Sequence, residues 1–156
     1  MASHHLVGNV GLYFAAYRLS QMGWNVMPTS RNARGIDLLA YDAPAGRYLG
    51  IQVKALAKKP PVPLGTSIDN LMGDWWIIVT NAAASNPECF IMKPDEVRSL
   101  AFRGEKEVEF HIGSSQTKPD TGFREAWVRI GGATFPRQHR LIRSCSPELV
   151  GDDIGG

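Results

Sequence analysis

Apolar residues recur at helical spacing near the start of the chain. The recurring positions are Leu6, Val10, Tyr13 or Phe14, Tyr17 and Leu19. Steps of three and four residues place such side chains on one face of a helix, so the pattern predicts an amphipathic helix over residues 7–22. Gly23 supplies the stop, because glycine readily adopts the left-handed conformation that ends helices.

Shorter apolar segments predict strands. Residues 24–27 predict a short first strand, and continuous apolar runs over residues 75–80 and 89–92 are typical of strands buried on both faces. Trp75 and Trp76 are neighbours, so a strand sends them to opposite faces of its sheet. We expect one of them in the core, with base stacking as the less favoured interpretation of the other.

Between the first strand and these runs, two apolar segments flank a short turn. Residues 38–42 and 47–51 are the segments, and Ala-Pro-Ala-Gly at 43–46 is the turn. This arrangement predicts a β-hairpin.

The hairpin brings polar side chains together. If Asp42 pairs with Arg47, the position sums of an antiparallel pair place Asp37 directly opposite Gln52, with Cβ atoms roughly 5 Å apart. Lys54 lies two residues further along and shares the face of Gln52. Polar groups in apolar strands cost free energy unless they bind each other, a metal or a ligand, so the three residues predict a functional site. A cross-strand ion pair is the competing interpretation.

The rest of the chain completes an α/β order. Residues 57–70 are rich in proline and predict an irregular, mobile loop near the site. Pro94 opens a short helix with acids in its first turn. Residues 108–112 predict an edge strand, and residues 123–130 predict a helix that carries Trp127. We therefore expect an α/β sandwich, a mixed central β-sheet flanked by helices.

Length and composition indicate one globular domain. The chain has 156 residues, of which 44% are hydrophobic. We expect a single domain over residues 1–143 and a flexible C-terminal tail over residues 144–156. Cys89 and Cys145 are too few for a disulfide framework. We expect a reduced, cytoplasmic protein without a signal peptide or a membrane-spanning helix.

Positive charge gathers in the part of the chain that holds the candidate site. Residues 1–60 carry seven Lys and Arg against two Asp, whereas the remainder carries ten basic against thirteen acidic residues. A basic surface attracts a polyanion such as nucleic acid, although an ordinary solvated surface also explains the charge.

The spacing of Asp37 and Gln52-Val53-Lys54 resembles the signature of the PD-(D/E)XK nuclease superfamily. That signature is an Asp near the end of one strand, followed by Glu-x-Lys or a variant on the next. Two further segments resemble the Holliday-junction-resolvase-like branch. They are Gly8 to Gly11 at the start of the helix and Gly23 to Val26 at the first strand. The resemblance covers roughly residues 6 to 93 and implies a restriction-endonuclease-like fold.

The resemblance also implies a mechanism. Asp37, Gln52 and the backbone carbonyl of Val53 would bind Mg²⁺ or Mn²⁺ through oxygen. The ion would polarise the scissile phosphate and lower the pKa of an attacking water. Lys54 would neutralise charge that builds on the phosphate. The expected function is hydrolysis of DNA phosphodiester bonds.

Two departures leave catalysis open. Many relatives carry a Glu on the first helix, and the matching position here is the apolar Leu12 or a neighbour. Gln52 also stands where Glu is usual. Fewer carboxylates hold a divalent cation less tightly, unless Asp69 or Asp74 compensates. The alternative is a catalytically eroded module of the same fold that binds nucleic acid or a protein partner without cleavage.

Several polar residues near the predicted hairpin are candidates for contacts with DNA phosphates. They are Ser30, Arg31, Asn32, Arg34, Lys58 and Lys59. A solvated turn or surface explains them about equally well. A homodimer would suit cleavage of both strands of a duplex, but nothing in the sequence requires one. No Gly-x-Ser-x-Gly occurs, and the four histidines lack metal-ligand spacing, so serine hydrolases and histidine-metal sites are disfavoured.

Overall fold

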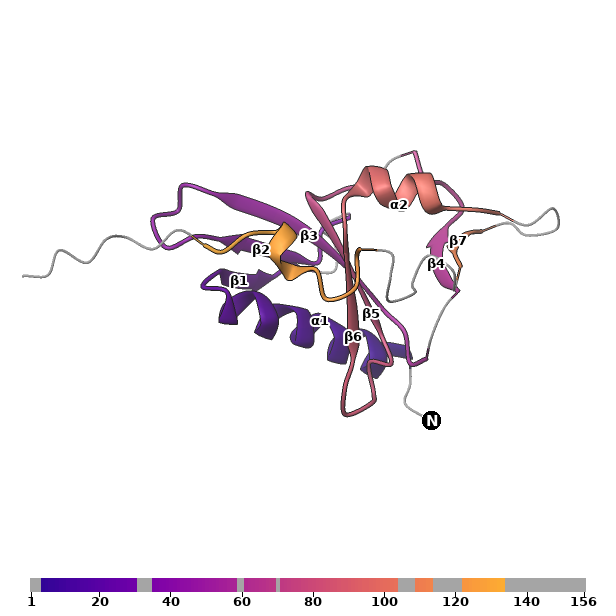
Figure 1. Ribbon diagram of the computed structural model, residues 1–156, viewed down its shortest axis with the longest axis horizontal. Helices are drawn as coiled ribbons and strands as arrows, with labels where there is room; N and C mark the ends of the chain where they lie inside the picture. Colours follow the sequence, from indigo (N-terminus) through magenta and orange to yellow (C-terminus); the bar gives the residue numbers. More distant parts are fainter. Residues whose placement is uncertain are drawn as a thin grey trace, which may run out of the picture.

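The computed structural model describes residues 4–30, 35–58, 61–69, 71–103, 109–113 and 122–133. A five-stranded sheet forms its centre, with one helix on each face (Figure 1). The helices are α1 (His4–Gln21) and α2 (Pro94–Leu100). The central strands are β1 (Asn25–Pro28), β2 (Leu38–Tyr41), β3 (Tyr48–Ala55), β5 (Trp75–Thr80) and β6 (Glu88–Met92). The predicted α/β sandwich is confirmed.

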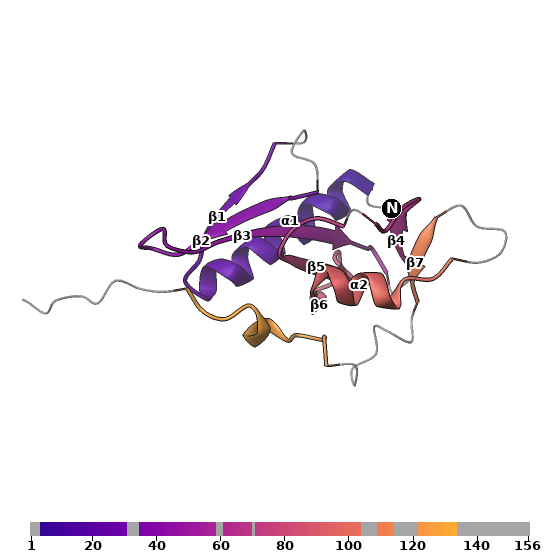
Figure 2. The ribbon, with the colours of Figure 1, turned by 90° about the horizontal axis from the view of Figure 1, so that it is seen from above.

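The sheet is mixed, in the order β1-β2-β3-β5-β6. Three of its pairings are antiparallel, and β3 pairs with β5 in parallel. A parallel pair needs a crossover connection, and here the crossover contains β4 (Val62–Gly65). This strand pairs with β7 (Phe110–Ile112) in a separate two-stranded sheet. Seen from above, α2 and the β4–β7 pair lie toward one end of the molecule, and the β2–β3 hairpin reaches toward the other (Figure 2).

Side chains of β5 alternate between two hydrophobic cores. Trp75 packs on the α1 side of the sheet and Trp76 on the α2 side, and both are buried. The prediction that only one of them is core is wrong, because helices cover both faces of the sheet. The Lys93 ammonium lies 3.7 Å from the ring centroid of Trp75, and the Trp76 indole donates to the Met72 carbonyl at 2.9 Å. Neither ring is available for stacking on a base.

The predicted first helix is confirmed, but the prediction of which face of it is buried is largely wrong. The buried residues of α1 are Val7, Gly11, Ala15 and Leu19, and of the predicted set only Leu19 is among them. Apolar residues occur on both sides of this helix, so periodicity alone could not decide which side faces the sheet. The smaller side chains face inward because they let the helix approach β3 closely.

Gly11 is the point of closest approach between α1 and β3. A Cβ atom at this position would overlap the Cβ of Ala55. We expect Gly11→Ala to lower the free energy of unfolding by about 1–3 kcal/mol, because overpacking outweighs the better helix propensity of alanine. Chemical denaturation measures the change. Gly8→Ala is the matched control, since a Cβ there meets nothing within 4 Å. Equal stability of the two variants would contradict the close packing.

Part of the predicted loop over residues 57–70 is ordered strand, which corrects that expectation. In β4, Val62 and Leu64 are buried in the core on the α2 side, and Pro63 between them is exposed. Proline is tolerated in β4 because both strands of this two-stranded sheet are edge strands. Residues 59, 60 and 70 lie outside the described part of the chain.

The predicted helix over residues 123–130 is also wrong. Only a 3₁₀ turn, η2 (Trp127–Arg129), forms there. The segment before it covers the outer edge of β6, where Ile91 N–H donates to the Phe123 carbonyl at 2.9 Å and Glu125 N–H to the Cys89 carbonyl at 2.7 Å. Pairing with a strand edge uses backbone groups that a helix would need for itself.

The helix predicted at Pro94 is confirmed as α2. The Glu96 carboxylate accepts the Lys93 N–H at 2.7 Å, which caps the helix, and it also pairs with Arg129. Burial tends to raise the pKa of Glu96, but the hydrogen bonds from Arg129 and the Lys93 backbone outweigh it and hold the pKa below its usual value. Glu96 therefore ties α2 to η2.

The remaining predictions concern the edge strand, the C-terminal tail and the absence of a membrane-spanning helix. The predicted edge strand is present as β7, although residue 108 lies outside the described part. The predicted tail, residues 144–156, lies wholly outside it. Across the described ranges, no helix is both long and apolar enough to cross a membrane.

Candidate functional site

The register of the β2–β3 hairpin is the predicted one. Leu38 pairs with Ile51 and Tyr41 with Tyr48. At the turn, Asp42 N–H donates to the Arg47 carbonyl at 3.2 Å, and the Asp42 carboxylate accepts the Arg47 N–H at 3.0 Å. The Asp42–Arg47 pairing that set the register is therefore confirmed.

Asp37 lies one residue before β2, opposite Gln52. Its Oδ2 accepts the Gln52 side-chain amide at 2.5 Å and the Val53 backbone N–H at 2.7 Å. Its backbone is held as well, because Asp37 N–H donates to the Ile51 carbonyl at 2.8 Å and its carbonyl accepts the Thr29 N–H at 2.9 Å. The predicted contact between Asp37 and Gln52 is confirmed, and the carboxylate is fixed in place before any ligand arrives.

Lys54 shares the face of Gln52, as predicted. Within the continuous strand β3, Gln52 pairs with Trp76 and Lys54 with Ile78, and both of these partners belong to the core on the α2 side. Lys54 is half-buried. Asp37 and Gln52 therefore meet where β2 begins, and Lys54 follows on the same face of β3.

Val53 lies beyond the last residue of β3 that pairs with β2. Its N–H points to the Asp37 carboxylate, and in a strand the carbonyl of the same residue points to the same edge. The Val53 carbonyl is thus directed to the side where Asp37 lies.

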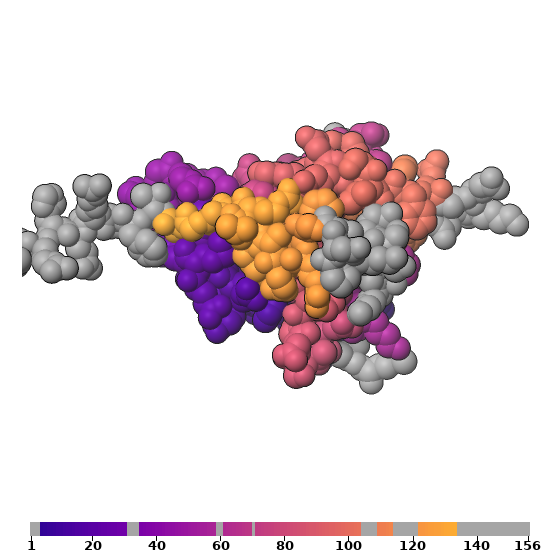
Figure 3. Space-filling model, in the orientation of Figure 1, coloured from indigo at the N-terminus to yellow at the C-terminus, as the bar shows by residue number. Residues whose placement is uncertain are grey.

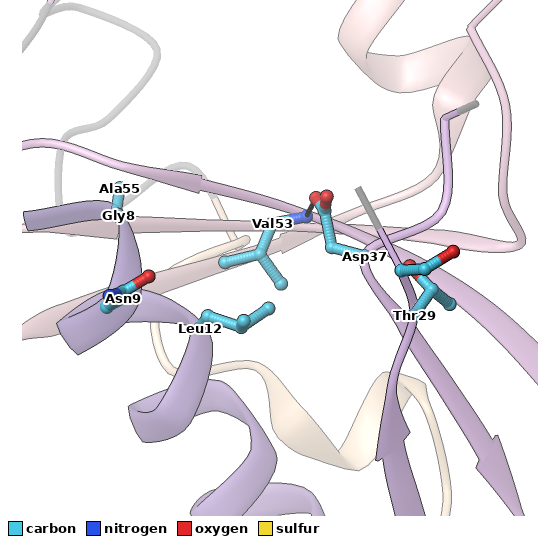
Figure 4. A pocket seen from close by; sticks show the side chains of 8 residues that line it. Gly8, Asn9, Leu12, Thr29, Asp37, Val53 and Ala55 are labelled. Atoms are coloured by element: carbon cyan, nitrogen blue, oxygen red, sulfur yellow. Dashed lines mark hydrogen bonds between the residues drawn. The ribbon is translucent and has the colours of Figure 1, made fainter. Parts of the chain in front are cut away.

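A cavity of about 250 Å³ opens beside this junction, on the α1 side (Figure 4). Helix α1, the end of β1 and the start of the hairpin enclose it. Its lining residues are Gly8, Asn9, Leu12, Thr29, Ser30, Asp37, Val53 and Ala55. In Figure 4 the Leu12 and Val53 side chains lie next to each other, and the Asp37 carboxylate lies by the Val53 nitrogen.

The cavity shows which α1 residues reach the site. Leu12 lines it, so an apolar side chain stands at one of the helix positions where the resemblance led us to expect an acid. Asn9 also lines it, and its position beside Asp37 was not predicted from the sequence. The signal that could have found Asn9 is its position three residues, or about one helical turn, before Leu12.

No second acid joins Asp37 within the described residues. The Asp74 carboxylate accepts the Gly50 N–H at 2.7 Å, and exposed Asp69 contacts Ser67. Neither of them lines the cavity with Asp37. In the described part of the chain, no group of three His, Cys, Asp or Glu side chains could hold a metal ion.

Few of the residues predicted to contact DNA can be placed. Ser30 lines the cavity with Asp37, and Lys58 is exposed just beyond β3. The remaining candidates, Arg31, Asn32, Arg34 and Lys59, lie outside the described residues.

Cys89 is unsuited to nucleophilic chemistry. It is fully buried in β6. Burial raises the pKa of its thiol to about 12, and the negative charge of Glu125 adds to the rise. The thiolate, which is the reactive form, is therefore scarce at neutral pH.

The fold has a known counterpart. The structure is similar to that of the bacterial homing endonuclease I-Ssp6803I, with a TM-score of 0.59 and 24% sequence identity. The match covers 83% of this chain and 92% of the other. No family model and no curated protein matches the sequence. The likeness establishes that this chain has a fold found in a nuclease.

Proposed function

We propose that this protein is a metal-dependent nuclease of the PD-(D/E)XK type that hydrolyses DNA phosphodiester bonds. One observation carries the proposal. Asp37, Gln52 and the backbone of Val53 converge at the start of β2, with Lys54 on the same face as Gln52. The fold shared with a homing endonuclease supports a nuclease-like function.

The donor set suits a hard divalent cation. The available oxygens are the Asp37 carboxylate, the Val53 carbonyl and, after rotation of its amide, the Gln52 side chain. Mg²⁺ is often held by one or two carboxylates together with substrate phosphates, so this set fits Mg²⁺ or Mn²⁺ when DNA is also bound. When bound, the ion would activate a water and polarise the phosphate.

The residues of the chain then have distinct roles. Asp37 accepts two hydrogen bonds at a single oxygen, which leaves its other oxygen to orient a ligand. Lys54 places a positive charge on the face of Gln52, where it would offset negative charge that builds on the phosphate. Ser30 lines the cavity and would donate a hydrogen bond to a neighbouring phosphate.

A second function is favoured by a specific observation. Leu12 occupies the α1 side of the cavity with an apolar side chain, and Gln52, an uncharged amide where an acid is usual, donates a hydrogen bond to Asp37. A site with one carboxylate would suit a module that binds DNA without cutting it.

Cleavage of supercoiled plasmid with Mg²⁺, Mn²⁺ or EDTA separates the two functions. A nuclease nicks or linearises the plasmid with metal and is silent with EDTA. We expect Lys54→Ala to lower the cleavage rate by roughly 10²–10³-fold at saturating DNA, as for other groups that stabilise transition-state charge.

Lys58→Ala is the matched control for that experiment. It removes an exposed lysine next to the same strand, so it should weaken binding and reduce its salt dependence while the rate at saturation stays unchanged. DNA binding that falls with salt, with no cleavage in either metal, would leave the binding module as the function.

A further inference from the structure

A short segment before β5 contacts the β2–β3 hairpin close to the candidate site. It comprises Met72, Gly73 and Asp74, and we call it the clasp. Asp74 N–H donates to the Gly50 carbonyl at 2.6 Å, and the Asp74 carboxylate accepts the Gly50 N–H at 2.7 Å. Gly50 precedes Gln52 by two residues on the same face of β3. One end of the clasp is therefore bound to β3 beside the site.

Met72 makes the second contact of the clasp, with the residues that lead into β2. A Cβ atom at Gly35 would lie 2.6 Å from the Met72 Cβ and 2.8 Å from its sulfur. Gly35 also has a φ of +74°, in the region that favours glycine. The Met72 backbone is anchored in turn, because its carbonyl accepts the buried Trp76 indole at 2.9 Å. The Met72 side chain thus packs directly on the backbone two residues before Asp37.

Ile36 lies between the two contacts of the clasp. A Cβ atom at Gly50 would lie 2.8 Å from the Ile36 Cδ1, so the Ile36 side chain rests on the backbone that Asp74 holds. The Ile36 carbonyl also accepts the Thr29 hydroxyl at 2.5 Å. Asp37 follows directly, so its approach to Gln52 is set by a chain that is held on two sides.

The sheet from which the clasp extends is fixed from outside. Residues 122–133, drawn in orange, lie across one face of the molecule between α1 and α2 (Figure 3). Arg18 of α1 pairs with Glu125 at 3.1 Å, and Glu96 of α2 pairs with Arg129 at 2.5 Å. These bridges hold both helices on the sheet. Loss of a clasp contact would therefore free the entrance of the hairpin and leave β5 in place.

We propose that Met72 is a positioning residue of the candidate site, which holds the Asp37 carboxylate against the Gln52 amide and the Val53 N–H by packing on Gly35. The catalytic consequence rests on the proposed function, in which Asp37 holds the metal ion. Met72 does not line the cavity, so it acts through the chain and not on a ligand. Small errors in placement matter, since a displacement of about 1 Å can lower a rate by roughly 10²-fold.

Amide hydrogen exchange on the full chain tests this role without any reaction. The Val53 N–H donates to Asp37, so its exchange reports whether the carboxylate stays in place. We expect Met72→Ala to speed Val53 exchange by about tenfold or more and to leave the buried Ile77 amide unchanged, because the opening is local. Met27→Ala is the matched control, since Met27 is 48% exposed against 45% for Met72 and lies on β1. It should leave Val53 exchange unchanged.

Two results of this measurement would overturn the proposal. One is the same Val53 exchange in Met72→Ala as in the wild type. The other is an equal rise at Val53 and Ile77, which would show a general loss of stability in place of a local role. The wild-type chain gives a further check, because a nuclear Overhauser effect must join the Met72 side chain to the Gly35 α protons. Its absence would also contradict the contact.

Cleavage measures the consequence for the proposed reaction. Met72→Ala should lower the rate at saturating DNA by about 10²-fold and leave the affinity for DNA unchanged. Met72→Leu conserves the volume of the side chain and should restore both the rate and the protection of Val53. An unchanged rate for Met72→Ala in a chain that cuts would overturn the proposal. If the wild type cuts in neither Mg²⁺ nor Mn²⁺, the proposed function fails, and Val53 exchange alone decides the role of Met72.

Discussion

We expect Asp37→Asn to lower the rate of metal-dependent DNA cleavage by about 10³-fold or more. The substitution removes the negatively charged side chain that would hold the catalytic metal ion. Asp37 is the only acid at the junction within the described residues. Asparagine keeps the size of the side chain and one acceptor for the Gln52 amide and the Val53 N–H. The fold should therefore survive while the negative charge is lost.

Single-turnover cleavage of a labelled duplex measures this effect, with circular dichroism and Tm to verify folding. Asp69→Asn is the matched control, because Asp69 is exposed and contacts only nearby Ser67 in the described structure. It should cut at the wild-type rate. Wild-type cleavage by Asp37→Asn would show that the chemistry takes place elsewhere.

Gln52→Glu is expected to tighten the binding of Mg²⁺ or Mn²⁺ by tenfold or more, equivalent to about 1.4 kcal/mol. The Gln52 amide now donates to Asp37 at 2.5 Å. A glutamate there would set two carboxylates within hydrogen-bond distance. Their repulsion destabilises the metal-free fold, and a divalent cation between them relieves it.

Calorimetric titration and the dependence of Tm on metal concentration measure the change. The metal-free Tm should fall by several degrees and recover with Mg²⁺, since bound ligand stabilises the folded state. Asn25→Asp adds the same charge on exposed β1 and should change neither quantity. Leu12→Glu, added to Gln52→Glu, should tighten binding further because Leu12 lines the cavity. No gain in metal affinity from either substitution would favour the binding module.

The sequence predicted the hairpin and its register without help from the rest of the fold. Asp42 and Arg47 flank a four-residue turn, and the period of two along each strand carries that pairing to Asp37 and Gln52. The same local rule placed Lys54 on the face of Gln52. Interactions within one hairpin depend on neighbours in the chain, so local pattern is sufficient to predict them.

Tertiary packing alone decided which side of α1 is buried. Both sides of α1 are apolar. Which side faces the sheet depends on how closely the helix approaches β3. That approach is set by the contact between Gly11 and Ala55, which are 44 residues apart in the chain. The burial of both Trp75 and Trp76 likewise follows from coverage of both sheet faces. The residues before η2 hydrogen-bond to the outer edge of β6, because a sheet edge presents backbone N–H and C=O groups that need partners. The same long-range packing brings Asn9 and Leu12 to the cavity beside Asp37. The spacing of apolar residues within α1 does not predict this.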